Sequence, residues 1–205
     1  MSFFFTTTMR KSLAIFSLAV ILGCITFLFY FQEVQYWLPT PIPKGFQTIA
    51  IGSEVELLDP HSGKKKFIHF YNPNCPCSKF NQENYRALLR DYNQKFDCYV
   101  VIQKTLDGLN DEEQTFLSGL GASLIVDTNK EIAKAFGVYA TPQIVLTDES
   151  NKIYYRGNYN QSRYCTQPAT NYAKIAIDSL LSHSQYLFPP PAFTAYGCDL
   201  NKPTD

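Results

Sequence analysis

The sequence predicts an α/β domain, with a mixed central sheet and flanking helices, behind one N-terminal transmembrane helix. Three observations predict it. An uncharged apolar run fills residues 12–31. From residue 46 onward, short apolar runs of strand length alternate with amphipathic helical patterns. Two further strand-like runs within residues 143–157 are separated only by a polar turn, which is typical of a hairpin. Alternation followed by a hairpin implies parallel and antiparallel strands in one sheet.

The first element is the run "SLAIFSLAVILGCITFLFYF", residues 12–31, which is about as long as a bilayer core is thick. Arg10 and Lys11 precede it, so the positive-inside rule keeps residues 1–11 in the cytoplasm. We therefore expect a single-pass protein of the inner (cytoplasmic) membrane, with its domain on the periplasmic side. A cleaved signal peptide stays open as an alternative, although no Ala-x-Ala-like site follows the run. Lipidation at Cys24, in "ILGC", also stays open.

The remaining elements follow in order behind a Pro-rich linker at residues 32–45. The predicted domain covers residues 46–183. Strands are predicted at 65–71, 98–103 and 123–127, and a helix at 78–96. Thr128 and Glu131 form a capping-box pattern for the next helix, which ends at Gly137. After the hairpin at 143–157 comes a helix near 173–181, and the Pro-rich tail 184–205 is expected to be irregular.

The charge balance and the number of cysteines bear on which classes of function are open to this chain. The chain has 205 residues, with 18 basic and 18 acidic side chains. This balance gives no electrostatic case for binding nucleic acid. Its six cysteines are too few for a disulfide-stapled mini-protein, so the position of each one decides its interpretation.

The segment "FIHFYNPNCPCSKF", residues 67–80, places Cys75 and Cys77 at a strand-to-helix junction. A helix N-terminus favours the thiolate form of a cysteine and makes it a nucleophile. The Cα atoms of residues i and i+2 approach to about 5.5–6.5 Å, inside the usual range for a disulfide. The pair therefore predicts thiol–disulfide exchange. Cu(I) binding by the two thiolates, as in a metallochaperone domain, is the alternative, and a redox-inactive binding module is a third.

This segment, followed by "FGVYATPQIVLTDESNKIYYRG", resembles the thioredoxin-like superfamily and, within it, the membrane-anchored TlpA-type branch. The resemblance covers roughly residues 46–182. It implies a thioredoxin fold in which Cys75 attacks, Cys77 resolves, and Thr141-Pro142 forms a cis-proline loop that binds the backbone of the substrate. The second cysteine arrives one residue earlier than in the family pattern. His69 takes a position where many members bury an aspartate, so it is a candidate for proton transfer to the second thiol.

The other cysteines receive separate interpretations. Cys98 opens an apolar strand and is expected to be a small buried side chain. Cys165 and Cys198 lie in loop-like segments and are expected either to form a disulfide that fixes the tail or to relay with the active pair. No cofactor and no resident metal is predicted. The expected partners are protein thiols or disulfides and a redox partner in the membrane.

Overall fold

The computed structural model describes residues 7–34, 37–161 and 164–200, without the side chain of Leu106. The chain divides into two compact units between Leu38 and Pro39. The predicted segments 1–11, 32–45 and 184–205 each lie partly outside the described residues.

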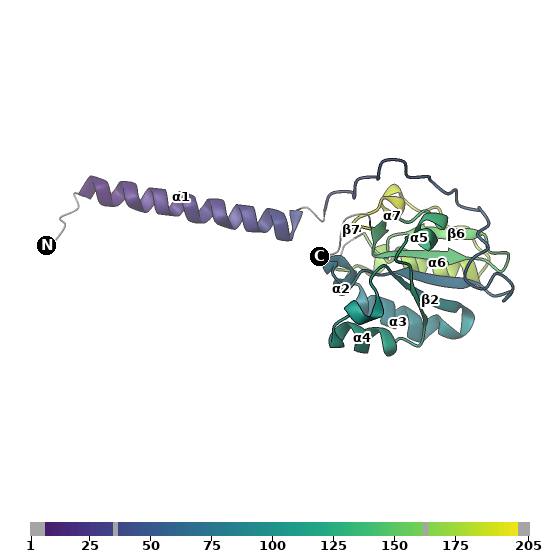
Figure 1. Ribbon diagram of the computed structural model, residues 1–205. Coiled ribbons are helices and arrows are strands. Elements are labelled where there is room, and N and C mark those ends of the chain that lie inside the picture. Colours follow the sequence, from purple (N-terminus) through teal and green to yellow (C-terminus); the bar gives the residue numbers. More distant parts are fainter. Residues whose placement is uncertain (1–6, 35–36, 162–163, 201–205) are drawn as a thin grey trace. The chain divides into compact units, whose positions relative to one another are not determined.

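The first unit contains helix α1, Thr7–Gln32 (Figure 1). It has 26 residues, carries no charge after Lys11, and exposes its apolar side chains along its whole length. By length and composition it is able to cross a membrane, a property that a signal sequence near the N-terminus shares.

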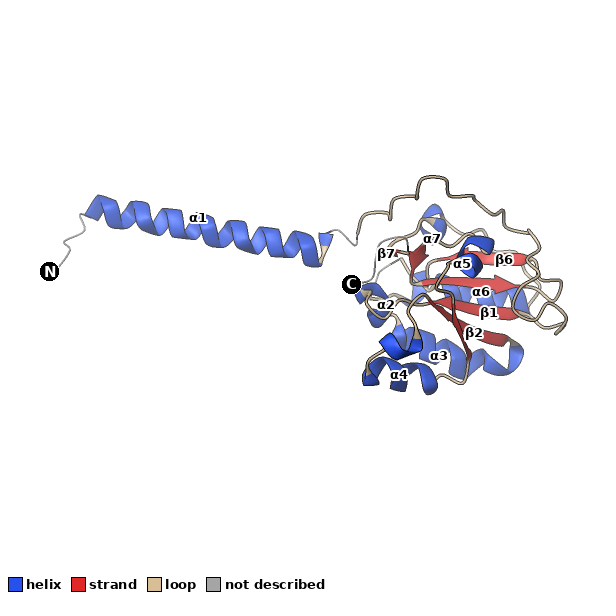
Figure 2. Ribbon diagram, in the orientation of Figure 1, coloured by secondary structure: helices blue, strands red, loops and turns tan. Residues whose placement is uncertain are grey.

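The second unit is built on a five-stranded sheet with the order β3-β2-β1-β5-β6 (Figure 2). The strands are β1 Lys66–Phe70, β2 Asp97–Ile102, β3 Ser123–Val126, β5 Gln143–Thr147 and β6 Ile153–Gly157. The first three are parallel, whereas β5 is antiparallel to β1 and β6 is antiparallel to β5. This is the mixed sheet of the thioredoxin fold. The sheet buries the central strand β1 at every position.

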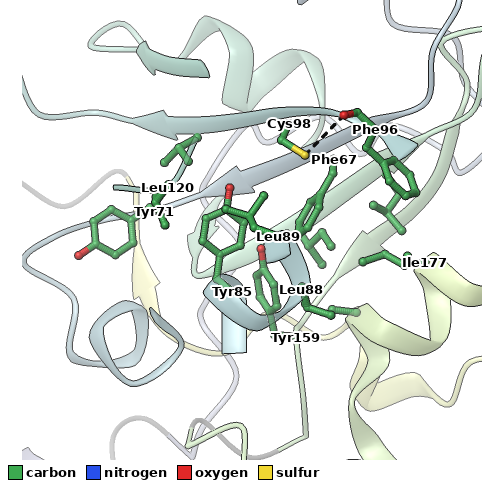
Figure 3. Close-up of a cluster of buried hydrophobic side chains, with 14 of the residues drawn as sticks. Phe67, Tyr71, Tyr85, Leu88, Leu89, Phe96, Cys98, Leu120, Tyr159 and Ile177 are labelled. Carbon is green, nitrogen blue, oxygen red and sulfur yellow. Dashed lines mark hydrogen bonds between the residues drawn. The ribbon is translucent and has the colours of Figure 1, made fainter. Parts of the chain in front are cut away.

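Successive residues of β1 point to opposite sides of the sheet. Because all of them are buried, helices cover both faces. On one side Phe67 packs with residues of α3, Gln82–Tyr92, and α6, Tyr172–Leu181 (Figure 3). The helix α4, Asp111–Ser118, joins this cluster. On the other side Ile68 and Phe70 pack with α5, Glu131–Ala135. Shorter helical turns between these elements are α2 Pro76–Phe80, η2 Asn93–Lys95, η3 Leu106–Gly108 and η4 Pro168–Thr170.

Two predicted helices differ in detail. The helix expected over 78–96 is interrupted at Asn81, a fully buried residue that ends α2 and precedes α3. The predicted capping box of Thr128 and Glu131 is wrong. Instead, the buried carboxylate of Asp127 accepts hydrogen bonds from the amides of Ile132 and Ala133. A carboxylate satisfies these first-turn amides better than a hydroxyl, because it also complements the helix dipole.

The C-terminal segment, expected to be irregular, folds onto the domain. It forms the helix α7, Pro190–Phe193, and the strand β7, Cys198–Asp199. The hydroxyl of Tyr155 and the main-chain N–H of Asn158 both donate to the carbonyl oxygen of Ala192, at 3.2 and 2.9 Å. A Cβ atom on Gly157 would lie 2.2 Å from that oxygen, so glycine is required for this close approach. The tail is therefore attached by packing as well as by any covalent bond.

Candidate thiol–disulfide site

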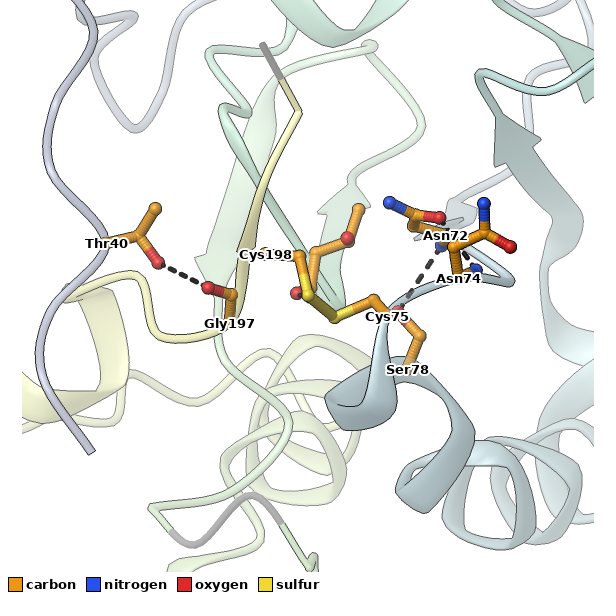
Figure 4. Close-up of a disulfide and its surroundings, with 8 residues drawn as sticks. Thr40, Asn72, Asn74, Cys75, Ser78, Gly197 and Cys198 are labelled. Atoms are coloured by element: carbon orange, nitrogen blue, oxygen red, sulfur yellow. Dashed lines mark hydrogen bonds between the residues drawn. A yellow bond between two sulfur atoms is a disulfide. The ribbon is translucent and has the colours of Figure 1, made fainter. Parts of the chain in front are cut away.

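Cys75 lies between the central strand and α2, where the sequence pattern placed it. The main-chain N–H of Asn72 donates to Ser78 Oγ at 3.3 Å, and the side-chain oxygen of Asn72 accepts from the N–H of Asn74 at 2.9 Å (Figure 4). The amide of Cys75 in turn donates to the carbonyl of Asn72 at 3.0 Å. These bonds fix the loop that presents Cys75, whose side chain is fully buried.

Cys75 forms a disulfide with Cys198, 123 residues away, with their Cα atoms 5.9 Å apart (Figure 4). The strand β7 pairs antiparallel with β4, Ala140–Thr141, and this register sets Cys198 opposite Thr141. The sulfur of Cys75 lies 3.5 Å from the carbonyl oxygen of Thr141. The Thr141–Pro142 peptide bond is cis. Cys75, Cys198 and the Thr141-Pro142 segment thus meet at one place.

The predicted disulfide between Cys165 and Cys198 is wrong. Strand pairing takes Cys198 to β4 and Cys75, whereas the thiol of Cys165 donates to Asn81 Oδ1 at 3.0 Å, at the junction of α2 and α3. Burial first, and the proximity of the Cys77 thiol second, raise the pKa of Cys165 to about 12. Cys165 is therefore a protonated thiol at neutral pH and lies near Cys77.

Cys77 is a buried cysteine outside any disulfide, 2% exposed, in the first turn of α2. The structure holds no Cys75–Cys77 disulfide, because the sulfur of Cys75 is bonded to Cys198. Cys77 is nevertheless separated from Cys75 by one residue and shielded from solvent. A macromolecular partner reaches it only after the surrounding structure opens.

His69 lies inside the domain, on the side of the sheet that faces α3. Its ring stacks on Tyr85 with centroids 4.0 Å apart, and its Nδ1 shares a hydrogen bond with the Tyr159 hydroxyl at 2.8 Å. Burial lowers the pKa of His69 to about 3, and a backbone interaction with Gln143 opposes this shift only in part. The ring is therefore neutral at pH 7.

The two remaining cysteines lie on other elements, Cys98 on β2 and Cys24 on α1. Cys98 belongs to the core cluster beside Phe67, as predicted, and burial raises the pKa of its thiol to about 12 (Figure 3). Cys24 is exposed on α1. Among the residues that the structure describes, no three His, Cys, Asp or Glu side chains gather as a metal site would require.

For Cys198, sequence reasoning left two alternatives open, a disulfide with Cys165 or a relay with the active pair, and did not single out Cys75 as its partner. It missed Tyr159 as the partner of His69. The tail does carry one signal for Cys198, since Gly197 precedes it and permits a close backbone approach. A Cβ atom on Gly197, whose φ is +135°, would lie 2.1 Å from the Thr141 carbonyl oxygen. For Tyr159 we find no signal in the sequence.

Solved structures share this fold at low sequence identity. A hypothetical protein from Sinorhizobium meliloti is 19% identical with a TM-score of 0.61, covering 75% of this chain and 95% of its own. An uncharacterized conserved protein from Geobacillus kaustophilus is 20% identical with a TM-score of 0.60, covering 80% and 98%. The thioredoxin domain of a thiol-disulfide oxidoreductase from Bacteroides vulgatus is 18% identical with a TM-score of 0.44, covering 63% and 99%. The last match is too loose to carry an argument.

No curated protein matches the sequence. A family model does match, and it spans residues 47–198, from the start of the folded domain to the cysteine that pairs with Cys75. Its description is "Domain of unknown function (DUF6436)". Because the match covers most of the chain, this protein belongs to the DUF6436 family.

Proposed function

We propose that the protein is a thiol–disulfide oxidoreductase of the TlpA type, in which Cys75 exchanges disulfide bonds with cysteines of other proteins. One observation supports this most directly. The sulfur of Cys75 is bonded to Cys198 on strand β7, and β7 pairs with β4 next to Cys75. A mixed disulfide between an enzyme and a peptide substrate would have the same connectivity.

The proposed reaction has two exchange steps. The thiolate of Cys75 attacks one sulfur of a substrate disulfide, forming a mixed disulfide and releasing one substrate thiolate. The thiolate of Cys77 then attacks the Cys75 sulfur, which releases the second substrate thiolate and leaves a Cys75–Cys77 disulfide. Two electrons pass from the protein to the substrate. The same steps in reverse oxidise a substrate dithiol. The burial of Cys77 suits it to the second, internal step.

The proposed role of His69 follows from its neutral state. A buried ring with a pKa of about 3 does not hold a second proton at neutral pH. We therefore assign His69 as the neutral hydrogen-bond partner of Tyr159, which positions that hydroxyl behind the central strand. A His69→Gln variant should keep its pH profile of exchange between pH 6 and 8. If the wild type shows an inflection in this pH range that the His69→Gln variant lacks, His69 does transfer a proton.

We also propose that α1 is an uncleaved anchor in the inner membrane and that the domain is periplasmic. The uncharged run after Arg10 and Lys11 supports this orientation. A disulfide is also expected in an oxidising compartment. A membrane redox partner would then restore the thiol state. Alkaline phosphatase fused after Asp205 should be active, and a fusion active only inside the cell would refute the orientation. The mass of the mature protein tests cleavage and lipidation at Cys24.

Trapping tests the exchange mechanism. Cys77→Ser should accumulate mixed disulfides on Cys75, whereas Cys75→Ser should neither trap partners nor turn over. Cys98→Ala is the matched control, because it removes another buried thiol, which lies on strand β2 and not on the elements that carry Cys75, Cys77 or Cys198. If Cys75→Ser traps as well as Cys77→Ser, the two roles are reversed. If neither variant traps, and both lose bound Cu(I) in a titration, the copper-binding alternative replaces the oxidoreductase.

A further inference from the structure

The strand β7 covers the proposed exchange site. Cys75 is fully buried beneath it, while Cys198 is half-buried. The register places Cys198 directly opposite Thr141, whose carbonyl oxygen is also the neighbour of the Cys75 sulfur. A substrate cysteine that reached Cys75 along β4 would have to take this same position. The tail and an extended substrate therefore compete for one strand edge.

The residues around Cys198 fit this edge closely. Gly197 passes so near to β4 that a Cβ atom would lie 2.1 Å from the Thr141 carbonyl oxygen. The hydroxyl of Thr40 donates to the Gly197 carbonyl at 3.1 Å, from the opposite side of the strand (Figure 4). Two residues after the cysteine, Leu200 is buried in the core cluster beside α5. The edge of β4 thus accommodates, in β7, an extended segment with a small residue before the cysteine and an apolar residue two positions after it.

We propose that Cys198 is a third exchange cysteine, which β7 holds in the position of a cysteine of an extended protein substrate. The inference rests on the proposed function of Cys75. In its reaction the substrate strand first leaves the β4 edge while its cysteine stays bonded to Cys75. β7 then pairs with β4, and the Cys198 thiolate attacks the Cys75 sulfur of the mixed disulfide, forms the Cys75–Cys198 bond and releases the substrate as a thiolate. The Cys77 thiolate then attacks Cys75, forms Cys75–Cys77 and releases the Cys198 thiolate, which frees β7 to leave the edge. Each step exchanges one disulfide for another, so no external oxidant is consumed.

A chemical probe separates the two resolving cysteines. The full-length reduced protein is treated with Ellman's reagent, which places a thionitrobenzoate group on Cys75 in a mixed disulfide. In Cys77→Ser, Cys198 should displace this group, so that peptide mapping finds a Cys75–Cys198 disulfide. In the double variant Cys77→Ser with Cys198→Ser, the adduct on Cys75 should persist at least tenfold longer. Cys77→Ser with Cys165→Ser is the matched control and should behave as Cys77→Ser alone.

The outcomes are distinguishable. An adduct that persists equally with and without Cys198 would overturn the proposal while leaving Cys75 as an attacking thiol. If Cys75 takes up no thionitrobenzoate in any variant, the proposed function itself fails.

A second variant tests the strand. Gly197→Ala in the Cys77→Ser background should lengthen the lifetime of the adduct at least tenfold, because the added methyl group prevents pairing with β4. Gly121→Ala is the control, since Gly121 also has a positive φ but its Cβ atom would meet nothing within 4 Å. An unchanged lifetime in Gly197→Ala would show that β7 does not deliver Cys198.

Discussion

Acid should destabilise this domain through His69, and replacing that residue should remove the effect. The ring is completely buried, between Tyr85 and Tyr159. Its pKa is lowered from an ordinary value of 6.5 to about 3, with desolvation as the main cause. Between these two values the unfolded chain binds a proton that the folded chain does not. Stability from the neutral ring is thus fully present above pH 6.5 and is lost as the pH falls toward 3.

The size of the effect follows from the two pKa values. Relative to pH 8, linkage gives a loss of about 1 kcal/mol at pH 5.5 and about 3 kcal/mol at pH 4, with a limit of about 5 kcal/mol below both values. Carboxylates also titrate in this range, but they contribute equally to the wild type and to a His69 variant. The difference between the two proteins isolates the histidine.

Urea unfolding at pH 8, 5.5 and 4 measures this difference. His69→Gln should be less stable than the wild type at pH 8, because it disturbs the contact with Tyr159, but its stability should fall less steeply with acid. His61→Gln replaces an exposed histidine and should follow the wild-type curve. Parallel curves for His69→Gln and the wild type would refute the buried, neutral assignment.

Three further predictions concern the disulfide, the α5 cap and a buried thiol. The Cys75–Cys198 bond closes a loop of 123 residues, so Cys198→Ser should lower stability by at most about 5 kcal/mol in oxidised protein and by little in reductant, as urea midpoints will show. Asp127→Ala should cost about 1–2 kcal/mol, whereas Thr128→Ala should cost less than about 0.5, and equal costs would contradict the cap. With a pKa of about 12, Cys165 should react with iodoacetamide at pH 8 roughly a thousandfold more slowly in the folded protein than in urea, and comparable rates would contradict its burial.

Local patterns predicted the fold well, because the strands and helices are set by apolar spacing that the sequence displays directly. Residues 65–71 contain the observed strand β1, and the hairpin within 143–157 matches β5 and β6. The N-terminus of α5 was mispredicted because several side chains compete to cap a helix, and Asp127 outcompetes Thr128 through its charge.

The site was less predictable for a different physical reason. Cys75 stands beside a recognisable strand-to-helix junction, but its partner lies 123 residues away on a strand of two residues. So short a strand has no period of its own. Its position depends on α7 docking against Tyr155 and Gly157, a tertiary contact with no local signature. The pKa of His69 likewise depends on how completely the folded chain excludes water.

The free energy of docking β7 on β4 explains why the Cys75–Cys198 disulfide would control access to the exchange site. Burial of Leu200 contributes about 2 kcal/mol, and the hydrogen bonds from Leu200 N to the Tyr139 carbonyl and from Thr40 to Gly197 contribute about 1 kcal/mol each. Ordering residues 196–200 costs about 1 kcal/mol per residue, or about 5 kcal/mol in total. Gains and costs nearly cancel, so reduced protein should hold β7 on β4 for only part of the time. The Cys75–Cys198 disulfide shifts this equilibrium toward the docked strand and keeps the β4 edge covered. Exchange of that disulfide with Cys77 would open the same edge to substrate.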